Sequence, residues 1–203
     1  MPDLSHEHRL GGIVAGIDEA GRGPFAGPVV AAAVVLPTDL PALLSGHLDD
    51  SKKLSHRQRE ALFEVITRCA AVGVGRAEVD EIDSINILQA TFLAMTRAVE
   101  ALGQPLDWAL VDGNRKPRLA CRVECLVGGD GLSLSIAAAS VMAKVTRDRM
   151  MGDLAEQFPG YGWDRNMGYG TAEHRAALLR LGPTPHHRRS FASVAKMFAV
   201  QGE

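Results

Sequence analysis

Two adjacent acidic residues stand near the start of the chain, between an apolar stretch and a glycine-rich loop. Asp18 and Glu19 follow the apolar, β-branched run 12–17, which predicts a short buried strand. The loop 21–23 reads Gly-Arg-Gly; its glycines permit a close backbone approach and its arginine is a planar donor suited to phosphate. Alone, such a pair of acids would more often simply cap a turn, with the arginine as an exposed charge. The combination favours metal-assisted chemistry on a phosphoester.

Carboxylates recur where later strands are expected to end. The run 108–111 predicts a fourth strand that ends at Asp112, and the run 123–127 predicts a fifth that leads to Asp130. Metal-dependent phosphodiester hydrolysis needs several carboxylates around a pair of cations, since magnesium prefers oxygen ligands and keeps some of its waters. The candidate metal ligands and catalytic acids are Asp18, Glu19, Asp112 and Asp130.

Two points about this set stay open at the sequence level. Neighbouring strand residues point to opposite faces, so Asp18 and Glu19 share a site only if the strand has already bent into its glycine loop, and we expect that bend. Asp148 is an alternative to Asp130 as the fourth ligand. Its other interpretation is a structural ion pair with Arg147 or Arg149.

The elements that must position these acids alternate between strands and helices. Two further strands are expected at 27–36 and 72–75, and a polar loop at 37–54. One helix is expected from Ser55, which has capping-box spacing to Gln58, and a longer one from Ser84, as its N-cap, to a stop at Gly103. Further helices are expected over 135–158, over 171–181 and at the end of the chain. The glycine-rich segment 159–170 cannot continue the long helix.

Composition predicts one α/β domain. The chain has 203 residues, 46% apolar and 23% charged, without an internal repeat. We expect an α/β core at about 12–158 and a C-terminal helical part at about 159–203. The longest apolar run, 29–36, is too short to span a bilayer, and no signal-peptide core is visible, so a cytoplasmic protein without a membrane partner is expected.

Charge is distributed unevenly along the chain. The net charge is −2, yet residues 140–196 hold nine Lys or Arg against five Asp or Glu, which gives +4 and leaves −6 for the remainder. A basic C-terminal third opposite an acidic site would suit a polyanion held over metal ions, although it could also be ordinary solvated helix surface.

Several motifs, in order, resemble ribonuclease HII, the bacterial type 2 ribonuclease H, over nearly the whole chain. They lie at 17–23, 50–54, 82–95, 111–114, 135–148, 168–171 and 186–191. The resemblance implies a ribonuclease H-like fold, a mixed five-stranded sheet flanked by helices with a C-terminal helical extension. It implies an endoribonuclease with two Mg²⁺ or Mn²⁺ ions on the four acids named above.

The same resemblance implies the substrate and its contacts. The enzyme would cut the RNA strand of RNA/DNA hybrids and duplex DNA on the 5′ side of a single embedded ribonucleotide, leaving a 3′-hydroxyl and a 5′-phosphate. Gly21, Arg22 and Gly23 would sense the 2′-hydroxyl, and Tyr169 would stack on the following deoxyribose. The candidate phosphate contacts are Lys52, Lys53, Lys144 and Arg188.

Three rival functions fit the sequence less well. A ribonuclease HIII usually has an additional N-terminal substrate-binding domain, for which about a dozen residues before the first strand leave no room. A catalytically silent duplex-binding protein would not need all four acids. A phosphotransferase is disfavoured because the loop lacks both the Walker lysine and the Rossmann glycine spacing. We expect a monomeric enzyme.

Overall fold

A mixed five-stranded sheet forms the centre of the protein, as the sequence predicts. The computed structural model describes residues 1–48, 51 and 54–199. Its strands are β1 (Val14–Ala20), β2 (Val29–Val35), β3 (Ala71–Ala77), β4 (Trp108–Asp112) and β5 (Arg122–Leu126), in the order β3-β2-β1-β4-β5. β2 pairs antiparallel with both β1 and β3, whereas β1 pairs parallel with β4 and β4 with β5.

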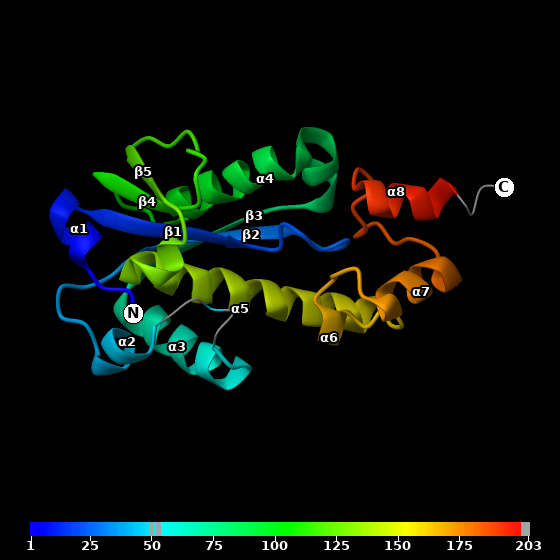
Figure 1. Cartoon of the computed structure of the whole chain (residues 1–203), viewed down its shortest axis with the longest axis horizontal. Helices are drawn as coiled ribbons and strands as arrows, with labels where there is room; N and C mark the ends of the chain where they lie inside the picture. The colour runs from blue at the N-terminus through cyan, green and yellow to red at the C-terminus, as the bar shows by residue number, and fades with distance from the viewer. Residues whose placement is uncertain (49–50, 52–53, 200–203) are drawn as a thin grey trace.

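Helices cover both faces of this sheet (Figure 1). α4 (Val79–Ala101) lies on one face, and α5 (Leu134–Gln157) lies on the other with α3 (His56–Cys69) outside it. The other helices are α1 (Ser5–Leu10), α2 (Ala42–His47), α6 (Trp163–Asn166), α7 (Ala172–Leu181), α8 (Ala192–Ala199) and the 3₁₀ turn η1 (Gly129–Gly131). α6, α7 and α8 gather at one end of the sheet.

Small residues on the strands let these helices pack closely. In β2, Ala31 and Ala33 face the α4 side of the core while Ala32 faces the α5 side, which is the period-two alternation of a strand buried on both faces. A Cβ placed on Gly73 would lie 2.0 Å from the Ala98 carbonyl oxygen in α4. Glycine at this position is therefore required by the contact between sheet and helix.

The predicted start of the long helix at Ser84 is wrong. α4 begins at Val79, and Glu78 and Glu81 form a capping box before it. The helix is kinked at Asn86, whose φ is 68° and whose side-chain oxygen accepts hydrogen bonds from the Leu88 and Gln89 amides at 3.0 and 3.2 Å. Asparagine tolerates this backbone conformation, and its side chain replaces the lost helical acceptor. The periodic stripe downstream of the kink is helical as predicted.

Other boundaries differ by shorter segments. The capping box of Ser55 and Gln58 is confirmed, and α5 begins at Leu134, one residue earlier than expected, with Ser133 as its N-cap. The expected loops 37–54 and 159–170 contain the short helices α2 and α6. Those helices have six and four residues, too few for a periodic pattern to reveal.

The C-terminal helices attach to the core through an apolar cluster of their own. Phe25 and Met151 contribute to it from the glycine loop and α5, and Trp163 and Leu178 from α6 and α7. This cluster connects the loop after β1 to the last third of the chain. None of the helices in the described part of the chain has the length and apolar character needed to cross a membrane.

Gly16 tests the packing of α5 on the sheet. A Cβ at this position would lie 2.1 Å from the Ser135 carbonyl carbon, so Gly16→Ala must push α5 away from β1. We expect a loss of about 1–3 kcal/mol in unfolding free energy, measured by urea denaturation. The matched control is Gly152→Ala within α5, where a Cβ meets nothing within 4 Å. That change should stabilise by about 0.5–1 kcal/mol, and equal behaviour of the two variants would contradict the assignment.

Candidate active site

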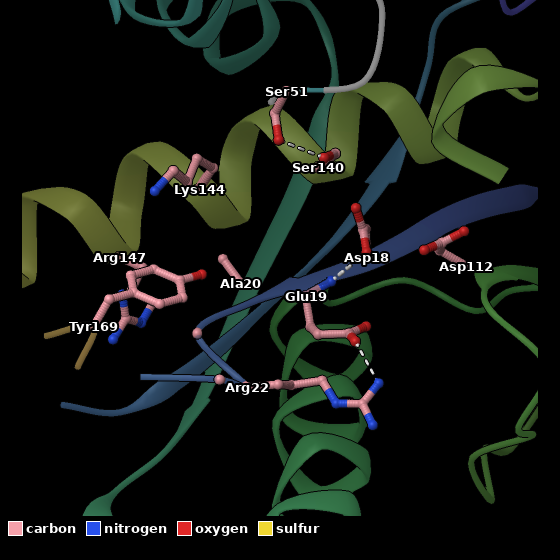
Figure 2. Close-up of a pocket in the computed structure, with 12 residues that line it drawn as sticks. Asp18, Glu19, Ala20, Arg22, Ser51, Asp112, Ser140, Lys144, Arg147 and Tyr169 are labelled. Atoms are coloured by element: carbon pink, nitrogen blue, oxygen red, sulfur yellow. Dashed lines mark hydrogen bonds and ion pairs between the residues drawn. The ribbon is translucent and has the colours of Figure 1, made fainter. Parts of the chain in front are cut away.

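Parallel pairing of β1 with β4 brings two acids side by side. Ile17 lies opposite Val111 in the ladder, and both pack into the core on the α4 side. The next residues, Asp18 and Asp112, therefore share the other face, toward α5. Both line one pocket of about 280 Å³ at the ends of these strands (Figure 2). The two sequence-predicted acids are thus brought together.

Glu19 reaches the same pocket from the opposite face of the sheet. The expected bend before Glu19 is wrong, because β1 continues to Ala20. Glu19 therefore points away from Asp18, and its Oε1 accepts a hydrogen bond from Arg22 Nη1 at 3.1 Å. It still lines the pocket, which opens beyond the strand ends. Its backbone amide donates to Asp18 Oδ1 at 2.7 Å.

Burial and like charge make Asp18 unusual. The residue is only 6% exposed. Burial raises the pKa of its carboxyl well above the ordinary value, and the nearby carboxylates of Glu19 and Asp112 raise it further. The Glu19 amide and the Ser140 hydroxyl act in the opposite direction. A proton or a cation is therefore favoured here.

The two candidates for the fourth acid have different surroundings. Asp130 is buried in η1, next to Gly129, whose amide donates to Asp112 Oδ1 at 2.7 Å. Asp130 does not line the pocket. Asp148 accepts a hydrogen bond from Lys144 Nζ at 2.8 Å, so the expectation that it pairs with Arg147 or Arg149 is wrong. Lysine is its partner because the two residues are one helical turn apart.

The carboxylates fit a hard cation by chemistry but are not closed around one. Carboxylate oxygens are the ligands that magnesium and manganese prefer. Yet among the described residues no three His, Cys, Asp or Glu side chains gather closely enough to hold a metal ion. Glu19 points toward Arg22 and away from Asp18, and Asp130 does not line the pocket.

The glycine loop forms the wall next to these acids. Gly21 has a φ of +95°, and a Cβ there would lie 2.0 Å from Arg147 Nε. A side chain at Gly21 would therefore collide with the protein's interior. At Gly23 a Cβ would meet only Tyr169 Cε1, at an ordinary 3.6 Å. Gly23 thus faces the aromatic ring across the pocket.

Tyr169 lines the pocket from the segment before α7 and is 47% exposed. Its carbonyl oxygen accepts a hydrogen bond from His174 Nδ1 at 2.9 Å. His174 is fully buried, and its Nε2 accepts from Trp163 Nε1 at 3.0 Å. Burial lowers the pKa of His174, which favours the neutral ring. This buried arrangement fixes the backbone from which the tyrosine projects.

Comparison with known proteins shows the family of this chain. The family model of ribonuclease HII matches residues 15–194. A ribonuclease HII of Paramagnetospirillum magneticum is 68% identical over 197 residues, which cover 97% of this chain and 98% of that protein. The chain belongs to the ribonuclease HII family. It is therefore a hydrolytic endoribonuclease.

Solved structures show the same fold. Ribonuclease H2 from Pyrococcus horikoshii superimposes with a TM-score of 0.74 at 25% identity and covers 94% of this chain and 99% of its own. Bst ribonuclease HIII in complex with Mn²⁺ has a TM-score of 0.77 at 20% identity, covering 98% of this chain and 74% of its own. The ribonuclease H-like fold predicted from the sequence is confirmed.

Arg188 does not have the role that its sequence context suggested. It is fully buried, and its guanidinium donates to the carbonyl oxygens of Gly21, Arg22, Gly27 and Pro28 at 2.5–3.2 Å. A direct phosphate contact is therefore excluded in this structure, and that prediction is wrong. Burial, together with the positive charge of Arg147, lowers the pKa of Arg188 to about 9. The group remains charged at neutral pH.

Arg147 lies beside it and was not predicted as a site residue. It is 1% exposed and donates to the carbonyl oxygens of Pro28, Met167 and Ala26 at 3.0–3.1 Å. Burial lowers its pKa to about 10. Arg147 also lines the pocket, as do Ser51 and Ser140, whose hydroxyls are 2.8 Å apart. The motifs 50–54 and 135–148 contain all three, which was the available signal.

Of the three lysines predicted to contact phosphate, the structure describes one. Lys144 lines the pocket from α5 while paired with Asp148. Lys52 and Lys53 lie outside the described residues.

Asp18→Asn should stabilise the metal-free protein. A carboxyl whose pKa is raised by folding loses stability as pH rises, because the unfolded chain releases its proton first. Asparagine stays neutral, so the variant should unfold at higher urea concentration at pH 7 in chelator, and the difference should vanish below about pH 3–4. Exposed Asp39→Asn is the control. A destabilised Asp18→Asn at pH 7 would contradict the raised pKa.

Proposed function

We propose that this enzyme incises nucleic acid duplexes at ribonucleotides, using the pocket at the ends of β1 and β4. Its substrates would be RNA/DNA hybrids and duplex DNA with single embedded ribonucleotides, cut on the 5′ side to leave a 3′-hydroxyl and a 5′-phosphate. The observation that supports this most is the placement of Asp18 beside Asp112, with Glu19 reaching the same pocket. Across from these acids lie the glycine loop and Tyr169.

The acids would hold two divalent cations, Mg²⁺ or Mn²⁺. The proposed ligands are Asp18, Glu19, Asp112 and, as the fourth, Asp130, because Asp148 is occupied by Lys144. When bound, such ions activate water for in-line attack and stabilise the leaving 3′ oxygen. Bst ribonuclease HIII, which shares the fold, was solved with Mn²⁺. In this proposal Glu19 exchanges its ion pair with Arg22 for the cation, which frees Arg22 for a phosphate.

Recognition of the ribonucleotide would come from the opposite wall. Main-chain groups of Gly21, Arg22 and Gly23 would contact the 2′-hydroxyl, which only ribose provides. Tyr169 would lie against the next sugar. A Cβ at Gly23 would lie 3.6 Å from Tyr169 Cε1, so the loop and the tyrosine ring are neighbours, which supports a shared role in recognition.

A basic groove continues from the pocket and would guide the duplex. A second cavity of about 280 Å³ shares Glu19, Arg22 and Asp112 with the first and extends to Arg115. A third, of about 420 Å³, adjoins it at Phe92 and is lined by Lys116 and Arg118. Arg115, Lys116 and Arg118 are exposed in the segment after β4. Cations spaced along a groove are the feature that binds a phosphate backbone.

Cellular context follows from this substrate. Ribonucleotide-containing DNA lies in the bacterial cytoplasm, so we infer a cytoplasmic enzyme. Every proposed ligand and contact comes from one chain, so a monomer would suffice.

The decisive assay incubates the protein with a labelled duplex containing one ribonucleotide, in magnesium, manganese or chelator, and sizes the products. Asp112→Asn should lose at least about a hundredfold in rate, since a metal site contributes several kcal/mol to the transition state, yet should still bind duplex. Asp130→Asn should behave like it. Asp148→Asn is the matched control and should lose only a few-fold. Near wild-type cleavage by Asp112→Asn would remove the two-metal assignment.

Tyr169 should decide between substrate types. Tyr169→Ala should lose most activity on a single embedded ribonucleotide and less on a long hybrid, because only the former presents a deoxyribose for the ring to lie against. Tyr169→Phe should keep much of both activities, since stacking does not need the hydroxyl. The measurement is kcat/KM on the two duplexes in parallel. Equal losses for Tyr169→Ala would mean that the ring only braces the loop.

A further inference from the structure

The glycine loop rests on two buried guanidinium groups that form no ion pair with an acid in the described part of the chain. Arg147 comes from α5 and Arg188 from the segment after α7. Neither guanidinium has a carboxylate oxygen of a described residue within 4.0 Å; the ion pairs of the described residues involve other side chains. Their donors are used on backbone carbonyl oxygens of residues 21–28 and 167. Two positive charges of this kind are costly to bury, which calls for a reason beyond packing.

Peptide geometry supplies such a reason. In a trans peptide unit the C=O and the N–H point in opposite directions. Arg188 binds the carbonyl oxygens of Gly21 and Arg22 at 2.5 and 2.9 Å. The same two peptide units carry the N–H groups of Arg22 and Gly23. Those N–H groups must therefore point away from the buried guanidinium, which does not itself line the pocket.

The two N–H groups are available for a ligand. Neither donates a hydrogen bond to any acceptor in the described part of the chain. Both residues line the active-site pocket. The loop cannot easily turn over, because Arg147 packs against Gly21 so tightly that a Cβ there would overlap its Nε.

We propose that Arg188 is a positioning residue for ribose recognition: by holding the Gly21 and Arg22 carbonyl oxygens, it aims the Arg22 and Gly23 N–H groups at the ribonucleotide. The recognised chemistry is the 2′-hydroxyl oxygen and the phosphate oxygens next to it. Arg147 fixes the other end of the same loop. This inference rests on the proposed function, in which the loop contacts ribose.

An arginine is needed here because its donors form a planar fork. The fork reaches the carbonyl oxygens of Gly21, Arg22 and Gly27 at once. A lysine would keep the charge but present a single ammonium centre, which cannot match that arrangement. Arg188→Lys therefore separates the effect of charge from the effect of orientation, and Arg188→Met removes both.

The experiment measures affinity in chelator, so that nothing is cleaved, for two duplexes that differ only by one 2′-hydroxyl. We expect wild type to prefer the ribonucleotide duplex. Arg188→Met should lose about three- to tenfold of that preference, the worth of roughly one hydrogen bond, while its affinity for the all-deoxy duplex changes by less than about twofold. Arg188→Lys should lose preference in the same way. Exposed Arg68→Met, on α3, is the control and should keep it.

The inference would be overturned if Arg188→Met lost affinity equally for both duplexes, or if Arg188→Lys kept the full wild-type preference for the ribonucleotide duplex. If Arg188→Met does not fold, Arg188→Lys decides by the same criteria. The Arg22 and Gly23 amide signals of ¹⁵N-labelled wild type give an independent readout. They should shift more with the ribonucleotide duplex than with its deoxy match, and equal shifts would count against the inference. A wild type without any preference would instead overturn the proposed ribose recognition.

Discussion

The parallel alignment of β1 with β4 is the constraint on which the site depends. It places Asp112 next to the buried Asp18, whose carboxyl pKa is raised by burial and by the carboxylates of Glu19 and Asp112. The surrounding elements hold them there: Gly16 lets α5 approach β1, and the Gly129 amide binds the Asp112 carboxylate at 2.7 Å. Packing of the core offsets the electrostatic cost of placing these carboxylates close together. Binding a proton or a cation would remove part of that cost, so the gain in free energy would be larger here than at an exposed pair of acids.

Much of the fold was predictable because local sequence patterns determine its strands and helices. Each strand is a short apolar run bounded by turn residues, and the helix that begins after Ser55 has its capping box in the sequence. The positions of the acids near strand ends were predictable for the same reason, since the sequence itself shows a carboxylate after an apolar run and before a glycine. Asn86 escaped prediction because a kink depends on one backbone angle that periodicity does not encode.

Long-range partners were harder to foresee. Arg188 lies in a basic segment, and the residue type alone does not distinguish an exposed phosphate contact from a buried group that binds four carbonyl oxygens. Asp148 was assigned the wrong partner because three cations stand within four residues of it. The orientation of Glu19 depends on how far β1 continues, and the glycines after it suggested an earlier bend than the structure has. The prediction of one domain, with an α/β core up to about residue 158 and a helical part after it, stays a prediction.

The pocket joins two groups of like charges that are neutralised in different ways. The positive groups, Arg147 and Arg188, are satisfied within the protein, because they donate to backbone carbonyl oxygens of residues 21–28 and of Met167. The negative groups, Asp18 and Asp112, form no ion pair with a lysine or arginine among residues 1–48, 51 and 54–199, where Arg22 pairs with Glu19 and Lys144 with Asp148. A group that is satisfied internally can only give shape, whereas a group left short of positive charge can bind. The arginines therefore set the form of the loop, and the acids remain the part of the pocket to which the proposed cations would bind.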